Sequence, residues 1–369
     1  MTMKILIAIN QSRVLYDFKR ELVDALAARG AEVILTLEED FRAEYFKKKN
    51  YRILPAPIDP RGMNPVSDAK LSRFYRELLT KERPDAALTF TIKPNVYCGR
   101  QCAKLGIPYY ATISGLGSAL NGSRPLRALA SFLYRRGLRG AERVFCQNAA
   151  IATWAESRGV ATKARIEEIP GSGVDLTRFR ALPYPEEEEG ATILFIGRLM
   201  RDKGIREYVE CARRVKETRP ATRFLIVGAQ ETGCPEHALA EEAAKEGIVE
   251  YCGYQMDVTP YIEKASAVML PSYHEGLSNV LLEGAACARP LLASNVPGCA
   301  EIFDEGITGF GFEARSADSA YEALQRFLAL DRETRAQMGL RGREKIAASF
   351  SREDVVGRYL RALFGEKEV

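Results

Sequence analysis

Short apolar segments alternate with helical patterns from the first residues onward, and this alternation leaves few folds open to the chain. The apolar segments have the length of buried strands, and the segments between them show apolar residues at helical spacing. The expected strands of the first half are 4–9, 31–37, 51–57, 86–91, 108–113 and 143–148, and the expected helices include 16–29, 65–83 and 95–105. Such an order predicts an α/β domain with a doubly wound parallel sheet, whose ligands bind beyond the carboxyl ends of the strands.

The same alternation begins again near residue 190, which predicts two domains. Residues 181–190 contain two prolines and four consecutive glutamates, a composition typical of a linker. A new strand is expected at 191–197, followed by a helix at 205–217. We therefore predict a Rossmann-like domain at 1–180 and a second at 181–349, with a final helix within 350–369. A chain of 369 residues is long enough for both.

The segment 272–285, Ser-Tyr-His-Glu-Gly-Leu-Ser-Asn-Val-Leu-Leu-Glu-Gly-Ala, follows an expected strand at 267–271. Ser278 is a suitable N-cap for the helical pattern that begins there. Glu275 therefore lies in the loop before a helix, and Glu283 lies on the helix. The loop and first turn offer backbone N–H groups and the positive end of the helix dipole, which suit a phosphate. The N–H groups can donate hydrogen bonds to a diphosphate, and the nearby carboxylates can accept hydrogen bonds from sugar hydroxyl groups. This combination predicts a site for a sugar nucleotide.

Two glutamates at this distance are weak evidence alone, because most such pairs lie on solvated helix faces. Glu283, however, stands within the apolar run 280–286, where a charge without a partner would be costly. This context favours a functional role for the pair.

The pattern Pro-Ser-x-x-Glu-Gly, six residues and Glu-Gly-x-Ala resembles the donor-site signature of retaining GT-B glycosyltransferases of family 4. The resemblance implies two Rossmann-like doubly wound domains that face each other across a cleft, with a C-terminal helix that crosses back to the first domain. It also implies that Glu275 contacts hydroxyls of the transferred sugar and that Glu283 holds the ribose of the nucleotide.

A second motif, Gly197-Arg198-Leu, three residues and Lys203-Gly204, resembles the diphosphate clamp of that family. The resemblance implies that Arg198 and Lys203 bind the leaving phosphates, and we assign both cations to catalysis together with Glu275. The remaining residues assigned to the nucleotide sugar are Gly197, Tyr254, Gly276, Leu277, Ser278, Asn279, Ser12 and Gly117.

Two loops of the first half resemble those of bacterial polyprenyl-diphosphate-linked sugar transferases, including N-acetylgalactosaminyl and galactosyl transferases of glycan assembly. The loop 91–95 contains Lys93, which is expected to project into the cleft between the domains, and the loop 113–118 contains Gly115 and Leu116. For either loop taken alone, a plain tight turn is the favoured interpretation. Many family members place a histidine in the N-terminal domain against the donor sugar, whereas residues 1–180 contain no histidine.

The net charge of +4 is unevenly distributed, since residues 1–180 hold 30 Lys and Arg against 18 Asp and Glu. Segment 121–140 combines Leu126, Leu129 and Leu133 at helical spacing with five arginines and no acid. Such a helix suits an anionic membrane surface, but a helix packed on the core with a solvated face fits the pattern equally well. No aromatic stacking platform or known motif accompanies the charge, so a nucleic-acid partner is not expected.

Several classes of protein are disfavoured. No apolar run is long enough to span a bilayer, and a strand is expected directly after the first residues, so we expect no signal peptide and a cytoplasmic, peripheral location. The eight cysteines and two histidines lack metal-site spacing. The first strand is followed by Asn-Gln-Ser-Arg instead of a glycine-rich phosphate loop, which disfavours a dinucleotide dehydrogenase. No Asp-x-Asp occurs, so no metal or other cofactor is expected.

We therefore predict a retaining, metal-independent transfer of a hexose or N-acetylhexosamine from a UDP-sugar to a lipid-linked saccharide. A family-4 enzyme with a soluble acceptor is the main alternative, and a UDP-sugar epimerase of the same fold is a weaker one. The sequence motifs leave open the sugar, the linkage, UDP against GDP, the catalytic base and the oligomeric state.

Overall fold

The computed structural model describes residues 2–59, 64–115, 124–188, 190–230 and 233–365, and its contacts divide the chain into two units. The N-terminal unit contains Met1–Ser172 and Glu353–Val369, and the C-terminal unit contains Gly173–Arg352. The sequence placed the domain boundaries at 180/181 and 349/350, so residues 173–180 lie in the C-terminal unit rather than in the first domain.

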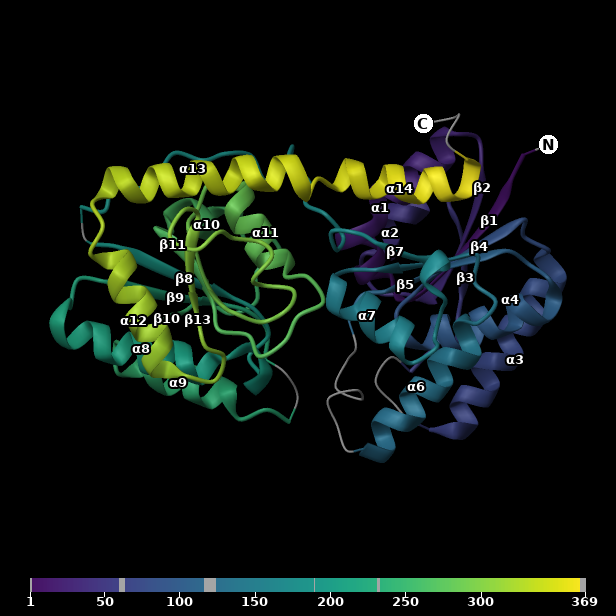
Figure 1. Cartoon of the computed structure of the whole chain (residues 1–369), viewed down its shortest axis with the longest axis horizontal. Helices are drawn as coiled ribbons and strands as arrows, with labels where there is room; N and C mark the ends of the chain where they lie inside the picture. Colours follow the sequence, from purple (N-terminus) through teal and green to yellow (C-terminus); the bar gives the residue numbers. More distant parts are fainter. Residues whose placement is uncertain (1, 60–63, 116–123, 189, 231–232, 366–369) are drawn as a thin grey trace. The chain divides into compact units, whose positions relative to one another are not determined.

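A seven-stranded parallel sheet with the order β3-β2-β1-β4-β5-β6-β7 forms the N-terminal unit (Figure 1). Its strands are β1 (Lys4–Gln11), β2 (Glu32–Glu38), β3 (Arg52–Pro55), β4 (Ala86–Phe90), β5 (Tyr109–Ile113), β6 (Arg143–Cys146) and β7 (Ile166–Glu168). Its helices are α1 (Ser12–Ala28), α2 (Ala43–Lys48), α3 (Pro65–Glu82), the π-helix η1 (Pro94–Cys98), α4 (Gly99–Leu105), α6 (Arg124–Leu138), α7 (Ala149–Ser157), the 3-10 turn η2 (Lys163–Arg165) and α14 (Arg352–Phe364). The order in which successive strands are added to the sheet reverses between β1 and β4.

The C-terminal unit repeats this plan with a six-stranded parallel sheet of order β10-β9-β8-β11-β12-β13. Its strands are β8 (Thr192–Ile196), β9 (Arg223–Val227), β10 (Glu250–Tyr251), β11 (Ala267–Leu270), β12 (Leu291–Ser294) and β13 (Gly309–Phe312). Its helices are the 3-10 turn η3 (Arg201–Lys203), α8 (Ile205–Thr218), α9 (Glu236–Lys245), α10 (Thr259–Lys264), α11 (Asn279–Ala286), α12 (Ala317–Leu328) and α13 (Arg332–Ser349). The order reverses between β8 and β11, so the predicted pair of doubly wound domains is confirmed.

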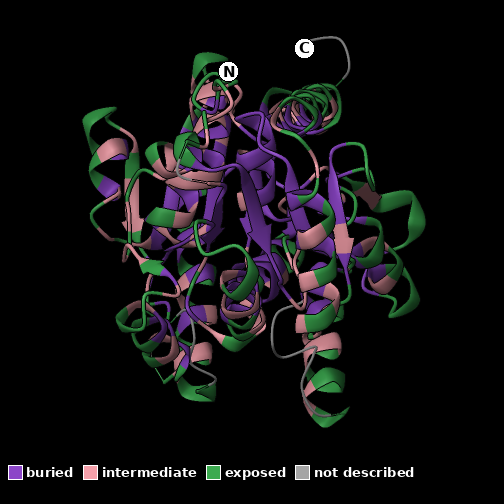
Figure 2. Ribbon diagram, turned by 90° about the vertical axis from the view of Figure 1, so that its left-hand side faces the viewer, coloured by how far each residue is buried: buried purple, intermediate pink, exposed green. Residues whose placement is uncertain are grey.

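Both sheets are buried on their two faces, which explains why their strands are apolar runs without alternation. In β1, Leu6 and Ala8 belong to one cluster of the core, while Ile5, Ile7 and Ile9 belong to another. Figure 2 shows the same layering, with buried strands inside and helices whose outer surfaces are exposed.

The acidic segment 181–190, predicted as a linker, belongs to the C-terminal unit, and its described residues, 181–188 and 190, pack within that unit. The guanidinium of Arg289 is fully buried and donates to the carbonyl oxygens of Leu182 and Pro183 at 3.2 and 2.7 Å. Arg335 of α13 forms an ion pair with Glu187 at 2.8 Å, with both side chains nearly buried. These contacts attach the segment to the second unit.

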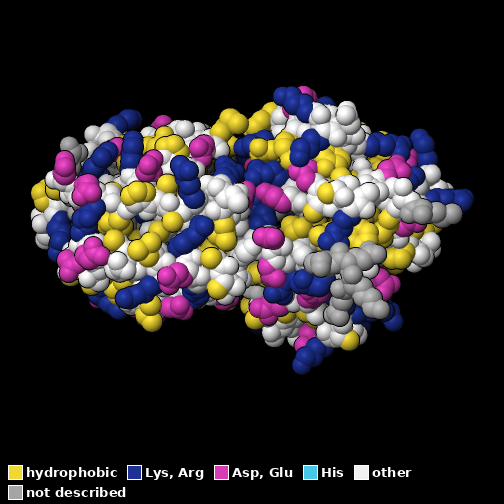
Figure 3. Space-filling model, turned by 90° about the horizontal axis from the view of Figure 1, so that it is seen from above, with side chains coloured by type: hydrophobic (Ala, Val, Ile, Leu, Met, Phe, Trp, Pro, Cys, Tyr) yellow, Lys and Arg dark blue, Asp and Glu magenta, His cyan; other side chains and the backbone are white. Residues whose placement is uncertain are grey.

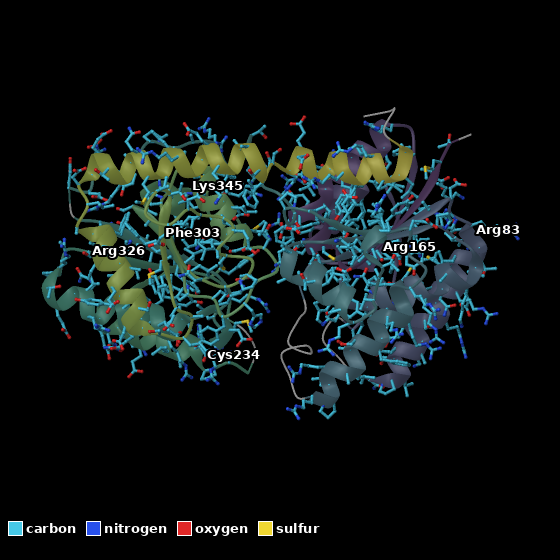
Figure 4. All side chains as sticks on the ribbon, viewed as in Figure 1. Arg83, Arg165, Cys234, Phe303, Arg326 and Lys345 are labelled. Carbon is cyan, nitrogen blue, oxygen red and sulfur yellow. The ribbon has the colours of Figure 1, made fainter. Side chains whose placement is uncertain are left out.

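Two ion pairs hold the loop before β13 to the helices around it. Lys345 of α13 contacts Asp304 at 2.7 Å, and Arg326 of α12 contacts Glu305 at 2.8 Å. Figure 4 labels both basic side chains, together with Phe303 in the same region.

The final helix α14 belongs to the N-terminal unit, as predicted. Tyr359 is buried and its ring lies 4.4 Å from that of Phe145 and 5.8 Å from that of Phe90, between ring centroids. Its hydroxyl shares a hydrogen bond of 2.8 Å with Thr112 of β5. The chain thus ends on the unit in which it began.

Candidate functional site

The candidate site lies at the carboxyl ends of β8 and β11 in the C-terminal unit. These two strands pair in parallel, and the strand order reverses between them. The loops that leave two such strands diverge toward opposite faces of the sheet, which opens the usual ligand position of a doubly wound fold. Here the loops are 197–204 after β8 and 271–278 after β11.

A close backbone approach joins the two loops. Gly204 has a φ of +71°, and a Cβ atom at this position would lie 2.0 Å from the carbonyl oxygen of Pro271. The backbone N–H of Tyr273 donates to the carbonyl oxygen of Asp202 at 2.9 Å, and the hydroxyl of Ser272 donates to the same oxygen at 3.1 Å. The glycine that ends the clamp motif is therefore required for this contact.

Lys203 and Glu275 come together across these loops. The Lys203 ammonium donates to the Glu275 carboxylate, with Nζ 2.5 Å from Oε1. Their side chains are 21% and 13% exposed, so the pair is partly shielded from water yet accessible. The ammonium has two further donors and the carboxylate has further lone pairs, which a ligand can use.

A third loop fixes the backbone around Glu275. Gly298 has a φ of +84°, and a Cβ atom at this position would lie 2.7 Å from the carbonyl oxygens of both Glu275 and Gly276. The N–H of Ser278 donates to the carbonyl oxygen of Gly298 at 2.8 Å, and Glu301 accepts from the N–H of Gly298 at 2.7 Å. Glu301 therefore supports the loop that carries Glu275.

Helix α11 begins directly after this loop. Ser278 is its N-cap, as predicted, and accepts from the N–H of Leu281 at 3.4 Å. Leu277 and Ser278 are buried, whereas Gly276 and Asn279 are partly exposed. Glu283 follows in the second turn of the helix, where it is partly exposed between buried neighbours. Backbone N–H groups and the dipole of α11 thus lie beside the Lys203–Glu275 pair.

The remaining predicted residues of this unit occupy the same edge of the sheet. Arg198 is exposed in the loop after β8. Gly197 lies against Gly228 after β9, where a Cβ atom on Gly228 would lie 1.7 Å from the Gly197 carbonyl oxygen. Tyr254 follows β10 with 47% of its surface exposed. The fold therefore gathers the clamp and Glu275 onto adjoining loops, and Glu283 lies on the helix that follows.

Sequence reasoning did not single out two side-chain pairs that support these loops. The hydroxyl of Tyr273 donates to Glu207 of α8 at 2.7 Å, and burial together with this bond raises the pKa of Tyr273 to about 12. His274 Nε2 lies 3.7 Å from the carboxylate of Asp202. Such partners are 66 or more residues apart in the chain, and no spacing rule connects them.

In the N-terminal unit, two of the predicted ligand residues, Ser12 and Lys93, have protein partners. Ser12 is fully buried and its hydroxyl donates to Asp40 at 2.6 Å, while the other carboxylate oxygen of Asp40 accepts from the N–H of Arg13 at 3.0 Å. The start of α1 is thus already capped by a carboxylate, which disfavours a phosphate there. Lys93, expected to project into a cleft, has only 11% of its side chain exposed and forms an ion pair with Asp68 at 2.8 Å.

Gly115 follows β5 and is partly exposed, whereas Leu116 and Gly117 lie outside the described residues. Among the residues that the structure describes, no group of three or more His, Cys, Asp or Glu side chains is arranged to hold a metal ion.

Known proteins match this chain over most of its length. The family described as "Glycosyl transferase 4-like domain" matches residues 19–171, and the family described as "Glycosyl transferases group 1" matches residues 182–345. The N,N'-diacetylbacillosaminyl-diphospho-undecaprenol alpha-1,3-N-acetylgalactosaminyltransferase of Campylobacter jejuni is 24% identical over 332 residues, which cover 85% of this chain and 86% of that protein.

Solved structures show the same fold. HepE of Anabaena, crystallised with UDP and glucose, superposes with a TM-score of 0.79 at 15% identity, over 98% of this chain and 99% of that one. Sucrose-phosphate synthase of Thermosynechococcus elongatus has a TM-score of 0.76 at 21% identity, with the same coverage. The chain therefore belongs to the GT-B glycosyltransferases, with a glycosyl transferase 4-like domain followed by a group 1 domain.

Proposed function

We propose that the protein transfers a hexose or N-acetylhexosamine from a UDP-sugar, with retention and without a metal ion, to a saccharide carried on polyprenyl diphosphate. The main support is the Lys203–Glu275 pair, which is fixed by tight loop contacts beside the start of α11. This arrangement offers cations and N–H groups to a diphosphate and a carboxylate to a sugar.

The chemistry follows from where charge develops. Breaking the bond between the sugar and the diphosphate leaves negative charge on the phosphate and positive character on the sugar. Lys203, Arg198 and the first N–H groups of α11 stabilise the leaving phosphate, which is the largest stabilisation available to such a site. Glu275 accepts from a hydroxyl of the sugar and orients it. The leaving phosphate then takes the proton of the attacking hydroxyl, so no separate protein base is needed.

The nucleotide assignment rests on Glu283 and on related structures. Glu283 lies one turn into α11, where its carboxylate suits the ribose hydroxyls while the start of the helix binds the phosphates. HepE of Anabaena was crystallised with UDP and with UDP-glucose. We therefore take UDP as the nucleotide of the donor.

The lipid-linked acceptor is supported by the relative from Campylobacter jejuni, whose name gives an undecaprenol-diphosphate saccharide as its acceptor. Such an acceptor would be met at the cytoplasmic face of a membrane. No helix in the described part of the chain is long and apolar enough to cross a bilayer. A peripheral contact through α6 would bring the enzyme to its acceptor.

The surface of α6 fits this contact. Its C-terminal half packs through Tyr134, Gly137 and Leu138, whereas Leu129 and Phe132 are 53% and 52% exposed. The guanidinium of Arg136 lies 5.5 Å from the centre of the Phe132 ring, so basic and apolar groups adjoin. On the face of the molecule that Figure 3 shows, basic and acidic side chains are interspersed.

A donor and acceptor panel tests the proposal. UDP-glucose, UDP-galactose and their N-acetylated forms are each incubated with a polyprenyl-diphosphate N-acetylhexosamine, with and without EDTA, and the product mass and anomeric configuration are measured. We expect one donor to give a product with retained configuration whether or not EDTA is present. An inverted product, or loss of activity with EDTA that a divalent ion restores, would contradict the mechanism.

Two other functions predict different outcomes. A sugar phosphate used far better than the lipid-linked saccharide would favour an enzyme with a soluble acceptor. An epimerised UDP-sugar formed without any acceptor would indicate an epimerase on the same fold.

A further inference from the structure

The loop after β4 in the N-terminal unit contains two unusual backbone features. Thr91 has a φ of +68°, a left-handed conformation that is rare for a β-branched residue. The next helix opens with a π-turn, η1, and both strained residues and π-turns concentrate at functional sites. β4 borders the reversal of strand order, where ligands of doubly wound sheets bind.

Buried polar contacts hold this conformation in place. Asn95 of η1 is fully buried, accepts from the hydroxyl of Thr89 at 2.7 Å and donates to the carbonyl oxygen of Thr112 at 2.8 Å. The π-turn is therefore tied to β4 and β5, and the residues between them have little freedom.

The side chain that this loop positions is Lys93. Its ammonium donates to Oδ1 of Asp68 at 2.8 Å, and the hydroxyl of Tyr97 donates to Oδ2 of the same carboxylate at 2.7 Å. Burial and the bond to Asp68 raise the pKa of Tyr97, so its hydroxyl remains a donor. Asp68 comes from the first turn of α3, which packs beside η1 and α4 (Figure 1). Two chain segments thus build one polar cluster.

The Lys93–Asp68 pair retains hydrogen-bonding capacity at a reachable position. Their side chains are 11% and 18% exposed. An ammonium has three donors and a carboxylate has about four acceptor sites, and the two contacts described use only part of each. A donor and an acceptor therefore stand side by side, which complements two neighbouring hydroxyl groups.

We propose that Lys93 and Asp68 bind a vicinal diol of the acceptor saccharide, with Tyr97 as a positioning residue for Asp68. Lys93 donates to one hydroxyl oxygen, and Asp68 accepts from the other hydroxyl. The proposal rests on the proposed function, since it names the part of the acceptor that the N-terminal unit recognises.

Steady-state kinetics test the proposal with the saccharide acceptor that the wild-type enzyme uses fastest. We expect Lys93→Met and Asp68→Ala to raise the acceptor KM by about tenfold to a hundredfold, the usual effect of losing a charged hydrogen bond, and to leave the donor KM within about twofold. Tyr97→Phe should raise the acceptor KM less, and Asp68→Asn should rank between wild type and Asp68→Ala.

Ser72→Ala is the matched control, because Ser72 accepts from Gln101 at 2.8 Å across the same helices. It should shift the melting temperature as much as Tyr97→Phe does, without changing the acceptor KM.

Monodeoxy acceptors identify the hydroxyls. One monodeoxy acceptor should lose affinity with the wild-type enzyme and show no further loss with Asp68→Ala. An unchanged acceptor KM in Lys93→Met and Asp68→Ala would overturn the diol site. The site would also be overturned if Asp68→Ala weakened the binding of every monodeoxy acceptor by the same further factor. Absence of transfer by wild type to any saccharide would refute the proposed function instead.

Discussion

Lys203 and Glu275 show how one ion pair can serve both binding and orientation. Each side chain restricts the other, because they meet between loops that are held by a shared backbone contact at Gly204. A cation held in advance of the reaction stabilises developing charge without further reorganisation. The loss of Lys203 should therefore lower the rate of catalysis far more than it lowers the stability of the fold.

Replacing Lys203 tests this difference. Lys203→Ala should lower kcat/KM by about a hundredfold to a thousandfold, the range found when a preorganised charge-stabilising group is lost. The control is Lys345→Ala, since Lys345 is 22% exposed against 21% for Lys203 and also pairs with a carboxylate. Both variants should have similar melting temperatures. If turnover falls equally in both, Lys203 has no special role.

Gly204 offers a second test, this time of the contact between the loops. Gly204→Ala meets both an unfavourable φ of +71° and the Pro271 carbonyl oxygen at 2.0 Å. Gly247 has nearly the same φ, +72°, with nothing within 4 Å of a Cβ. Gly247→Ala should therefore cost only the conformational penalty of about 1–2 kcal/mol, and Gly204→Ala should cost more and also weaken UDP binding. Chemical denaturation of both variants, with calorimetric titration of UDP, measures these effects, and equal losses of stability would mean that the contact is unimportant.

At the level of elements, the sequence predicted most strands and helices because parallel strands buried on both faces give apolar runs. The predicted segment 143–148, for example, matches β6 (Arg143–Cys146). β7 was missed because it has only three residues, Ile-Glu-Glu, two of them charged. The segment 181–190 has the composition of a linker, but distant arginines fix it to the C-terminal unit. Contacts of that kind leave no local pattern in the sequence.

The candidate site divides in the same way. Glu275, Glu283 and Lys203 stand in motifs with fixed spacing, so they could be named before any coordinates were known. The ion pairing of Lys93 with Asp68 could not be predicted, because α3 and the loop after β4 come into contact only when the domain is folded. For α6, helical spacing indicated an apolar stripe of Leu126, Leu129 and Leu133, whereas the structure exposes Leu129 and Phe132 and leaves the other two partly buried.

This exposed pair gives a prediction about α6. The double variant Leu129→Ser/Phe132→Ser should bind anionic liposomes at least about tenfold more weakly, because each large apolar side chain contributes roughly 1.5–3 kcal/mol when buried. Phe41→Ser is the control, since Phe41 is 57% exposed in the same unit but lies outside α6. Co-sedimentation with vesicles of phosphatidylglycerol, and with neutral vesicles, measures the effect. Equal binding by the double variant and the control would exclude α6 as the contact.

For the molecule as a whole, the two units have separate cores, and the last helix links the end of the chain to the first unit. The C-terminal unit contains one large cluster, and the N-terminal unit contains one cluster on each face of its sheet. Tyr359 of α14 joins the second of these clusters beside Phe90 and Phe145. The helix should therefore stabilise the N-terminal unit even though the chain reaches it after completing the C-terminal one.

Removing the Tyr359 ring should consequently weaken one unit alone. Tyr359→Ala should destabilise the N-terminal unit by about 3–5 kcal/mol, the usual cost of deleting a buried aromatic ring, and Tyr359→Phe by only about 1 kcal/mol through the lost bond to Thr112. Tyr208→Ala provides the reciprocal control, because Tyr208 is fully buried in the C-terminal unit and its hydroxyl donates to Ile193 at 2.7 Å. Hydrogen exchange followed by mass spectrometry should show faster exchange in β4 and β5 for Tyr359→Ala and in β8 and β9 for Tyr208→Ala. Two independent cores should confine the loss of packing to the unit that contains the substitution. Faster exchange in both sheets for either variant would therefore contradict this prediction and mean that the units unfold together.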